Sequence, residues 1–134
     1  MDWKLELVVP VADVDRATAF SMEQAGFRLD VDHRAGDESR VVQLTPPGSA
    51  CSIALMRNTG APGSLQGLHL VVPGIEAARA ELAGRGADVS EVYHFESGNQ
   101  VDGPDPGRAD YGSILSFGDP DGNGWLVQEV RGNP

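Results

Sequence analysis

A short motif occurs twice in this chain, and the repeat constrains the fold more than any other feature. Leu7-Val8-Val9-Pro10 recurs as Leu70-Val71-Val72-Pro73. Each copy is rich in β-branched residues, which predicts a short strand, and each leads into a helical pattern. The repeat therefore predicts two halves that fold in the same way.

Each repeated strand is followed by an apolar stripe at helical spacing. The first helix is expected to begin near Asp13, a good N-cap residue, and to stop at Gly26. The second is expected to run from Ile75 to Gly86. Each half thus begins with a strand and a helix.

Three strand-like segments follow each helix, separated by turn-forming residues. They cover residues 27–34, 40–45 and 51–56 in the first half, and 89–95, 113–117 and 125–130 in the second. A long stretch rich in Gly and Pro, residues 96–110, is expected to be a loop, and either a lid or a simple insertion. Each half therefore follows the order β-α-β-β-β.

The predicted fold class is α+β, with two βαβββ modules forming a curved mixed sheet around a cleft. The chain is expected to be a single domain, residues 1–134, with module one at about 1–58, a linker at 59–66 and module two at about 67–134. Clefts of this kind are where small ligands usually bind. A ferredoxin-like α+β fold without internal symmetry is the alternative.

The charge balance excludes some classes of partner. Ten Lys and Arg against twenty Asp and Glu give a formal net charge of -10. Nucleic-acid binders need a basic face, and an anionic membrane surface repels an acidic chain. No segment approaches the roughly 20 apolar residues of a membrane span. We expect a cytoplasmic protein whose partner is a small molecule, with no nucleic acid and no membrane.

Several short motifs occur in a fixed order along nearly the whole chain. They are Val11–Ala17, Phe20, Gly26-Phe27, Ile75–Arg79, Leu82, Arg85-Gly86 and Asp119–Asn123. Together with the repeat, these motifs resemble those of the vicinal oxygen chelate superfamily, which includes glyoxalase, bleomycin resistance proteins and extradiol dioxygenases. The resemblance implies two modules around a cleft, and a homodimer.

The Asp119–Asn123 segment has a second interpretation, the start of a calcium-binding EF-hand loop. The bidentate Glu of such a loop would fall at Val130, and Pro120 and the flanking strands disagree with two helices. A β-turn between the last two strands, with Gly122 and Asn123 at positive φ, is favoured.

Enzymes of this superfamily typically hold one divalent metal through His, Gln or Glu side chains, one on the first and one on the last strand of each half. The resemblance therefore makes Glu6, His69 and Gln128 the candidate ligands for Zn, Ni, Mn or Fe. A buried and unpaired Glu6 would be costly, so two interpretations compete with the ligand role: a hydrogen-bonded structural Glu, and a Glu at a strand end open to water.

The remaining ligand positions carry weak donors. In the first half they fall near Ser52, Ala54 or Met56, and on the last strand at Leu126. Together with Val8 these residues are expected to line the cleft. Glu129 is expected to face the other way unless a bulge intervenes. The set is incomplete, and that puts metal chemistry in doubt.

A second candidate cluster lies at the ends of the long polar stretch. Tyr93 and His94 precede it and Tyr111 follows it. An imidazole beside aromatic rings is expected to line the cleft mouth, and His94 is a candidate catalytic base.

Three functions follow. The first is a binding or resistance protein that holds a small organic molecule without a full catalytic metal site. The second is a divalent-metal-dependent lyase, isomerase or dioxygenase that uses Glu6 and His69. The third is a metal-free enzyme with Glu6 or His94 as general base. The sequence leaves open whether the protein is an enzyme.

Overall fold

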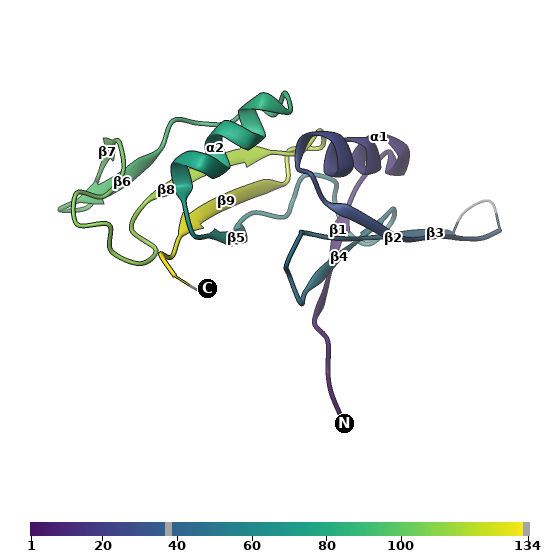
Figure 1. Cartoon of the computed structure of the whole chain (residues 1–134). Coiled ribbons are helices and arrows are strands. Elements are labelled where there is room, and N and C mark those ends of the chain that lie inside the picture. Colours follow the sequence, from purple (N-terminus) through teal and green to yellow (C-terminus); the bar gives the residue numbers. More distant parts are fainter. Residues whose placement is uncertain (37–38, 133–134) are drawn as a thin grey trace. The chain divides into compact units, whose positions relative to one another are not determined.

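The computed structural model describes residues 1–36 and 39–132, which form an α+β fold with two α-helices and two mixed sheets of four and five strands (Figure 1). This confirms the predicted fold class. The chain packs as two compact units: Met1–Gln66 with Asp119–Asn123, and Gly67–Gly118 with the chain from Gly124 onward. That the units make one domain stays a prediction.

The first unit contains one sheet with the strand order β1-β4-β3-β2. Strand β1 pairs with β4 in parallel, and the other neighbours are antiparallel. Helix α1 packs on β4, and its apolar side meets a core in which Val9, Leu44 and Leu55 are each at most 2% exposed. Burying each such side chain contributes about 1.5–3 kcal/mol. The elements are β1 (Glu6–Pro10), α1 (Val14–Ala19), β2 (Arg28–Ala35), β3 (Ser39–Thr45) and β4 (Ser52–Met56).

Helix α1 begins where the sequence predicts and changes form before its predicted end. The Asp13 carboxylate accepts a hydrogen bond from the Arg16 N–H at 3.1 Å, as an N-cap should. At Phe20–Gln24 the helix widens into a π-helical segment, labelled η1. The Ser21 hydroxyl donates to the Ala17 carbonyl at 2.8 Å, a back-bond that favours bending. Gly26, at φ 76°, then reverses the chain.

The second unit repeats this plan with one additional strand. Its sheet has the order β5-β9-β8-β6-β7, and β5 pairs with β9 in parallel. Its elements are β5 (Leu68–Val72), α2 (Ile75–Gly84), β6 (Tyr93–Glu96), β7 (Asn99–Asp102), β8 (Ile114–Gly118) and β9 (Gly124–Glu129).

Two sequence predictions in this half are wrong. Residues 89–95 do not form one strand: Val89 makes only an isolated bridge with Phe117, and β6 starts at Tyr93. The stretch 96–110 is not all loop, because β7 pairs with β6 around a tight turn at Ser97-Gly98. Both turn residues have positive φ, 51° and 81°, which is typical of a two-residue hairpin.

The Asp119–Asn123 hairpin joins β8 to β9 but packs in the first unit. The Asp119 Oδ1 accepts the backbone N–H groups of Asp121 and Asn123, both at 2.9 Å, and Gly122 has φ 95°. The predicted β-turn is therefore present. The positive φ expected at Asn123 is wrong, because that residue instead turns its side chain into the protein and is 0% exposed.

None of the helices in the described ranges is long and apolar enough to cross a membrane.

Candidate functional site

The side of the first sheet opposite α1 brings together most of the first-half candidates. Side chains alternate between the two sides of a strand, so each residue shares a side with the residue paired beside it. Glu6 pairs with Ser52, Val8 with Ala54, and Gln43 with both Ala54 and Val31. We call this surface the Glu6 face. Its members are Glu6, Val8, Val31, Gln43, Thr45, Ser52, Ala54 and Met56.

Glu6 is exposed on this face, in agreement with the interpretation of a strand end open to water. Strand β1 is an edge strand and Glu6 is its first residue, so water reaches the carboxylate. The Gln43 side-chain amide donates to Glu6 Oε2 at 2.9 Å. Glu6 therefore sits as a hydrogen-bonded carboxylate at a strand end, without a desolvation cost.

The buried part of the Glu6 face is closed by hydroxyl groups. The Thr45 and Ser52 hydroxyls are 2.6 Å apart, and the Thr45 hydroxyl also donates to the Asp30 carboxylate. This hydrogen bond, together with that from Arg28, holds the pKa of Asp30 below its usual value. Asp30 lies where the register shifts between Leu29 and Val31, so a bulge turns it toward Thr45. Ser52 is thus committed to a structural network.

The second sheet has an equivalent surface opposite α2. Its register places His69 beside Leu126 and Val71 beside Gln128. We call this surface the His69 face. His69 is exposed, whereas Leu126 and Gln128 are half-buried. The members of the face are His69, Val71, Tyr93, Ile114, Ser116, Leu126 and Gln128.

The strand pairing shows which residues lie directly beside the candidate ligands Glu6 and His69. In the first half the pair is Glu6 and Ser52, and in the second it is His69 and Leu126. Leu126 has no donor atom, and the Ser52 hydroxyl is hydrogen-bonded to Thr45. Within residues 1–36 and 39–132, no group of three or more His, Cys, Asp or Glu side chains is arranged to hold a metal ion. This donor set does not fit a complete catalytic metal site.

His94 is separated from the aromatic residues that flank it. Tyr93 and Phe95 meet edge to face, with ring centroids 5.9 Å apart, whereas His94 points to the other side of β6 and is 3% exposed. His94 and Tyr93 therefore lie on opposite sides of β6, and the grouping of both with Tyr111 at a cleft mouth stays a prediction. Tyr111 is exposed, and its backbone N–H donates to the Glu129 carbonyl at 2.7 Å.

Both ring nitrogens of His94 face hydrogen-bond acceptors. Nδ1 lies 2.7 Å from the Gly103 carbonyl and Nε2 lies 2.9 Å from Glu96 Oε1. Only the imidazolium form can donate to both. The Glu96 carboxylate, followed by the Gly103 carbonyl, raises the pKa of His94. A ring held in this way has no free lone pair, so its proposed role as a general base stays untested and gains no support.

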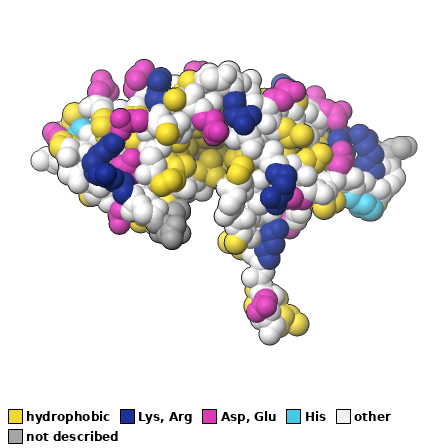
Figure 2. Space-filling model, viewed as in Figure 1, with side chains coloured by type: hydrophobic (Ala, Val, Ile, Leu, Met, Phe, Trp, Pro, Cys, Tyr) yellow, Lys and Arg dark blue, Asp and Glu magenta, His cyan; other side chains and the backbone are white. Residues whose placement is uncertain are grey.

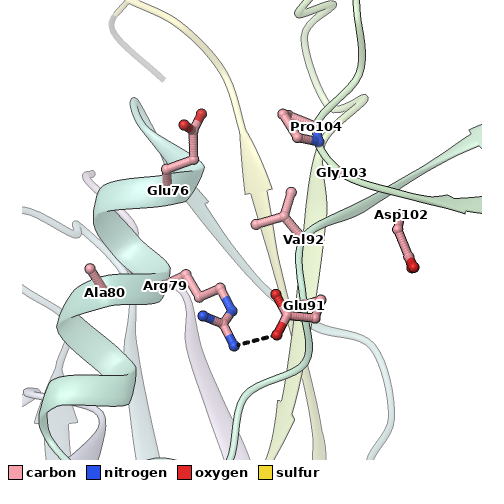
Figure 3. Close-up of a pocket in the computed structure, with 8 residues that line it drawn as sticks. All are labelled: Glu76, Arg79, Ala80, Glu91, Val92, Asp102, Gly103 and Pro104. Carbon is pink, nitrogen blue, oxygen red and sulfur yellow. Dashed lines mark hydrogen bonds and ion pairs between the residues drawn. The ribbon is translucent and has the colours of Figure 1, made fainter.

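The structure contains a pocket that the sequence does not predict, between α2 and the β6–β7 region (Figure 3). Its volume is about 470 Å³. Arg79 extends from α2 across it and donates to the Ser90 carbonyl at 2.9 Å and to Glu91 at 3.1 Å. One wall of the pocket includes Asp102 of β7, a strand that the sequence analysis did not predict. The turn-forming pair Ser97-Gly98, which joins β6 to β7, is the sequence signal that could have indicated this strand. The lining residues are Glu76, Arg79, Ala80, Glu91, Val92, Asp102, Gly103 and Pro104.

Comparison of the whole chain with known proteins identifies its relatives. No family profile matches the sequence. It is 25% identical to the uncharacterized protein YetH of Bacillus subtilis (strain 168), over 92% of this chain and 94% of that protein. It is 31% identical to TnmS3, an antibiotic binding protein from Streptomyces sp. CB03234, with 96% of each chain covered and a TM-score of 0.74.

A second solved structure from Streptomyces sp. CB03234, described as a glyoxalase/bleomycin resistance protein, is 33% identical, with a TM-score of 0.71. The match covers 94% of this chain and 99% of that protein. With this identity over nearly its whole length, the chain belongs to the glyoxalase/bleomycin resistance protein family.

Proposed function

We propose that this protein binds a small, largely apolar organic molecule on the Glu6 face and releases it chemically unchanged. The observation that carries the proposal is the donor set. Glu6 pairs with Ser52 and His69 pairs with Leu126, so neither candidate has a strong metal ligand directly beside it, and Gln128 is the one further candidate, on the same face as His69. Binding then remains as the function that the surface supports best.

The chemistry of the Glu6 face suits such a ligand. Val8 and Val31 are 44% and 45% exposed, so they offer apolar contact area. The Glu6–Gln43 hydrogen bond adds one polar feature that can orient a ligand. Ligand sites typically combine apolar walls with a few fixed polar groups. The antibiotic-binding description of a relative at 31% identity supports the same ligand class.

Calorimetric titration with a panel of apolar antibiotics, before and after treatment with a chelator, tests the proposal. We expect saturable binding of at least one compound with an affinity that the chelator does not change. Mass spectrometry should recover the bound compound intact after prolonged incubation. A modified compound, or binding that disappears with the metal, would contradict it.

Two variants locate the binding surface. Val8→Asp places a charge on the Glu6 face and should weaken binding at least tenfold, because an apolar ligand would have to desolvate the new carboxylate. Met22→Asp is the matched control, since Met22 is 40% exposed but lies on the η1 segment. Equal loss in both variants would show that added charge, and not the Glu6 face, is responsible.

The metal-dependent reaction remains the second candidate, because Glu6 and His69 are exposed side chains of ligand type. Metal analysis of protein purified without a metal-affinity tag separates the two. Stoichiometric Zn, Ni, Mn or Fe that is lost in the Glu6→Ala, His69→Ala double variant would replace binding with lyase, isomerase or dioxygenase chemistry as the proposal.

A homodimer is also proposed, on the resemblance to the superfamily. Strand β1 is an edge of its sheet, and it contains the exposed apolar residues Leu7 and Val8, with exposed Leu5 directly before it. Uncovered edges of this kind tend to pair with another chain. Light scattering after size exclusion should give twice the mass of one chain, and a mass of one chain would reject the proposal.

A further inference from the structure

The first unit contains a pocket of about 440 Å³ on the α1 side of its sheet, away from the Glu6 face. It lies where the start of α1 meets the β2–β3 hairpin and the chain after β4. Figure 2 shows basic and acidic side chains gathered along that hairpin. The lining residues are Ala12, Asp13, Val14, Asp15, Arg34, Arg40 and Arg57.

Strand alternation explains why three arginines converge there. Arg34 pairs directly with Arg40 across β2 and β3, so both lie on one side of the sheet. Arg40 shares this side with Val42, two residues later, which is fully buried. Arg57 likewise follows the buried Leu55 by two residues. The three guanidinium groups thus project on the side that carries the apolar core.

Arg40 is fixed in place by carboxylates. Its Nε and Nη2 donate to both oxygens of Asp32 at 2.9 Å, and its Nη1 donates to Asp15 at 2.6 Å. These contacts raise the pKa of Arg40 and lower those of both acids. The other acid in the lining, Asp13, accepts the Arg16 N–H as the helix cap. Both lining carboxylates are therefore already engaged.

Within the described residues, Arg34 and Arg57 donate no side-chain hydrogen bond and form no ion pair. Asp15 and Asp32 do attract Arg34 electrostatically, because its charge helps to lower the pKa of both carboxyl groups, but neither carboxylate contacts its guanidinium group. Other arginines do have carboxylate partners, namely Arg16, Arg28, Arg40, Arg79 and Arg108.

We propose that this pocket binds the phosphate group of a small molecule, with Arg34 and Arg57 as its ligands and Arg40 as a fixed positive neighbour. Guanidinium groups can donate two parallel hydrogen bonds to phosphate oxygens, and the donors of Arg34 and Arg57 are not engaged by any side-chain hydrogen bond within the described residues. The site is separate from the Glu6 face, so it does not depend on the function proposed above.

Inorganic phosphate is the probe, titrated into the full chain at constant ionic strength with chloride as the balancing anion. We expect saturable binding and shifts of the Arg34 and Arg57 side-chain Nε–H signals in NMR spectra. The Arg34→Gln, Arg57→Gln double variant should bind phosphate at least tenfold more weakly. The Arg85→Gln, Arg131→Gln variant removes the same charge from the second unit and should bind as the parent does.

Equal weakening in both double variants, or no saturation at tens of millimolar phosphate, would overturn the proposal. Tighter binding of acetate or citrate than of phosphate would overturn the assignment of the anion. Spectra of each variant report whether it folds. If the double variant does not fold, the single variant Arg57→Gln, at an exposed position after β4, replaces it in the titration. It should weaken phosphate binding severalfold.

Discussion

Replacing Asn123 by Ala should destabilise the protein far more than an ordinary hairpin substitution. Asn123 follows the turn between β8 and β9, yet its side chain is 0% exposed. Its Oδ1 accepts the Leu65 N–H at 3.1 Å. Its Nδ2 donates to the Pro10 carbonyl at 3.1 Å and to Asp119 Oδ2 at 2.8 Å. One amide thus joins three segments distant in sequence.

The magnitude follows from these contacts. A hydrogen bond between neutral groups contributes about 1 kcal/mol net, and one to a carboxylate about 1.5–3 kcal/mol. Losing all three gives a decrease in the free energy of unfolding of about 4 kcal/mol, since the backbone groups of Leu65 and Pro10 also lose their partner. In thermal unfolding this corresponds to a decrease in Tm of roughly 10–20 °C.

Urea unfolding followed by circular dichroism measures the effect. Asn99→Ala is the matched control, because Asn99 is an exposed residue of β7, and its change should stay within about 0.5 kcal/mol. A loss below about 1 kcal/mol in Asn123→Ala would show that water replaces the amide. The Asn123 side chain would then not be what holds the hairpin to the segments around Leu65 and Pro10.

Three further changes test other parts of the structure. Gly63→Ala should destabilise the protein, because Gly63 has φ 79° and a Cβ there would lie 2.2 Å from the Asp121 carbonyl oxygen. Thermal unfolding measures the loss of stability, and a Tm equal to that of the parent would contradict the prediction. Folding raises the pKa of His94, so the stabilisation that protonated His94 gives the folded state is complete below the ordinary value of 6.5 and is lost as pH rises through the folded pKa. In His94→Gln the free energy of unfolding should therefore change less with pH over that range. An unchanged slope would reject the imidazolium form. Glu129→Ala should lower the free energy of unfolding, measured in urea, by about 2–3 kcal/mol, because it removes a charge-assisted hydrogen bond to the first N–H of α2. A helix content and a stability equal to those of the parent would exclude a capping role for Glu129.

The sequence predicted what depends on local pattern and repetition. The repeated Leu-Val-Val-Pro motif indicated β1 and β5, and the Asp13 cap indicated the start of α1. Period-two alternation also placed His69, Leu126 and Gln128 on one side of a sheet, as the register of β5 and β9 confirms. These features need only neighbouring residues or one comparison between the halves.

The sequence did not predict features that depend on contacts between distant segments. The burial of His94 depends on Gly103, which reaches it through the unpredicted strand β7. The Arg34, Arg40 and Arg57 pocket needs the β2–β3 register and the end of β4 together. A hydrophobicity pattern contains no information on which polar and charged side chains meet in space. It therefore could not predict the surroundings of His94 or the arginine pocket.

Glu129 shows how local and distant requirements combine to limit the chemistry of the last strand. Both helices need an acceptor for their first N–H groups, and α1 has one nearby in Asp13. Helix α2 has Gly74 at that position, without a side chain, so Glu129 of β9 supplies the acceptor: its Oε2 lies 2.9 Å from the Ile75 nitrogen. Its other oxygen lies 3.6 Å from Arg108, and the residue is only 2% exposed.

Strand β9 therefore turns its one carboxylate toward α2. The unbroken register from Leu68 to Val72 leaves no bulge that would bring Glu129 to the His69 face. Leu126 and Gln128 are the β9 residues that lie on that face. Because Gly74 has no side chain to cap α2, the carboxylate of β9 caps that helix, and the His69 face has no carboxylate among its members.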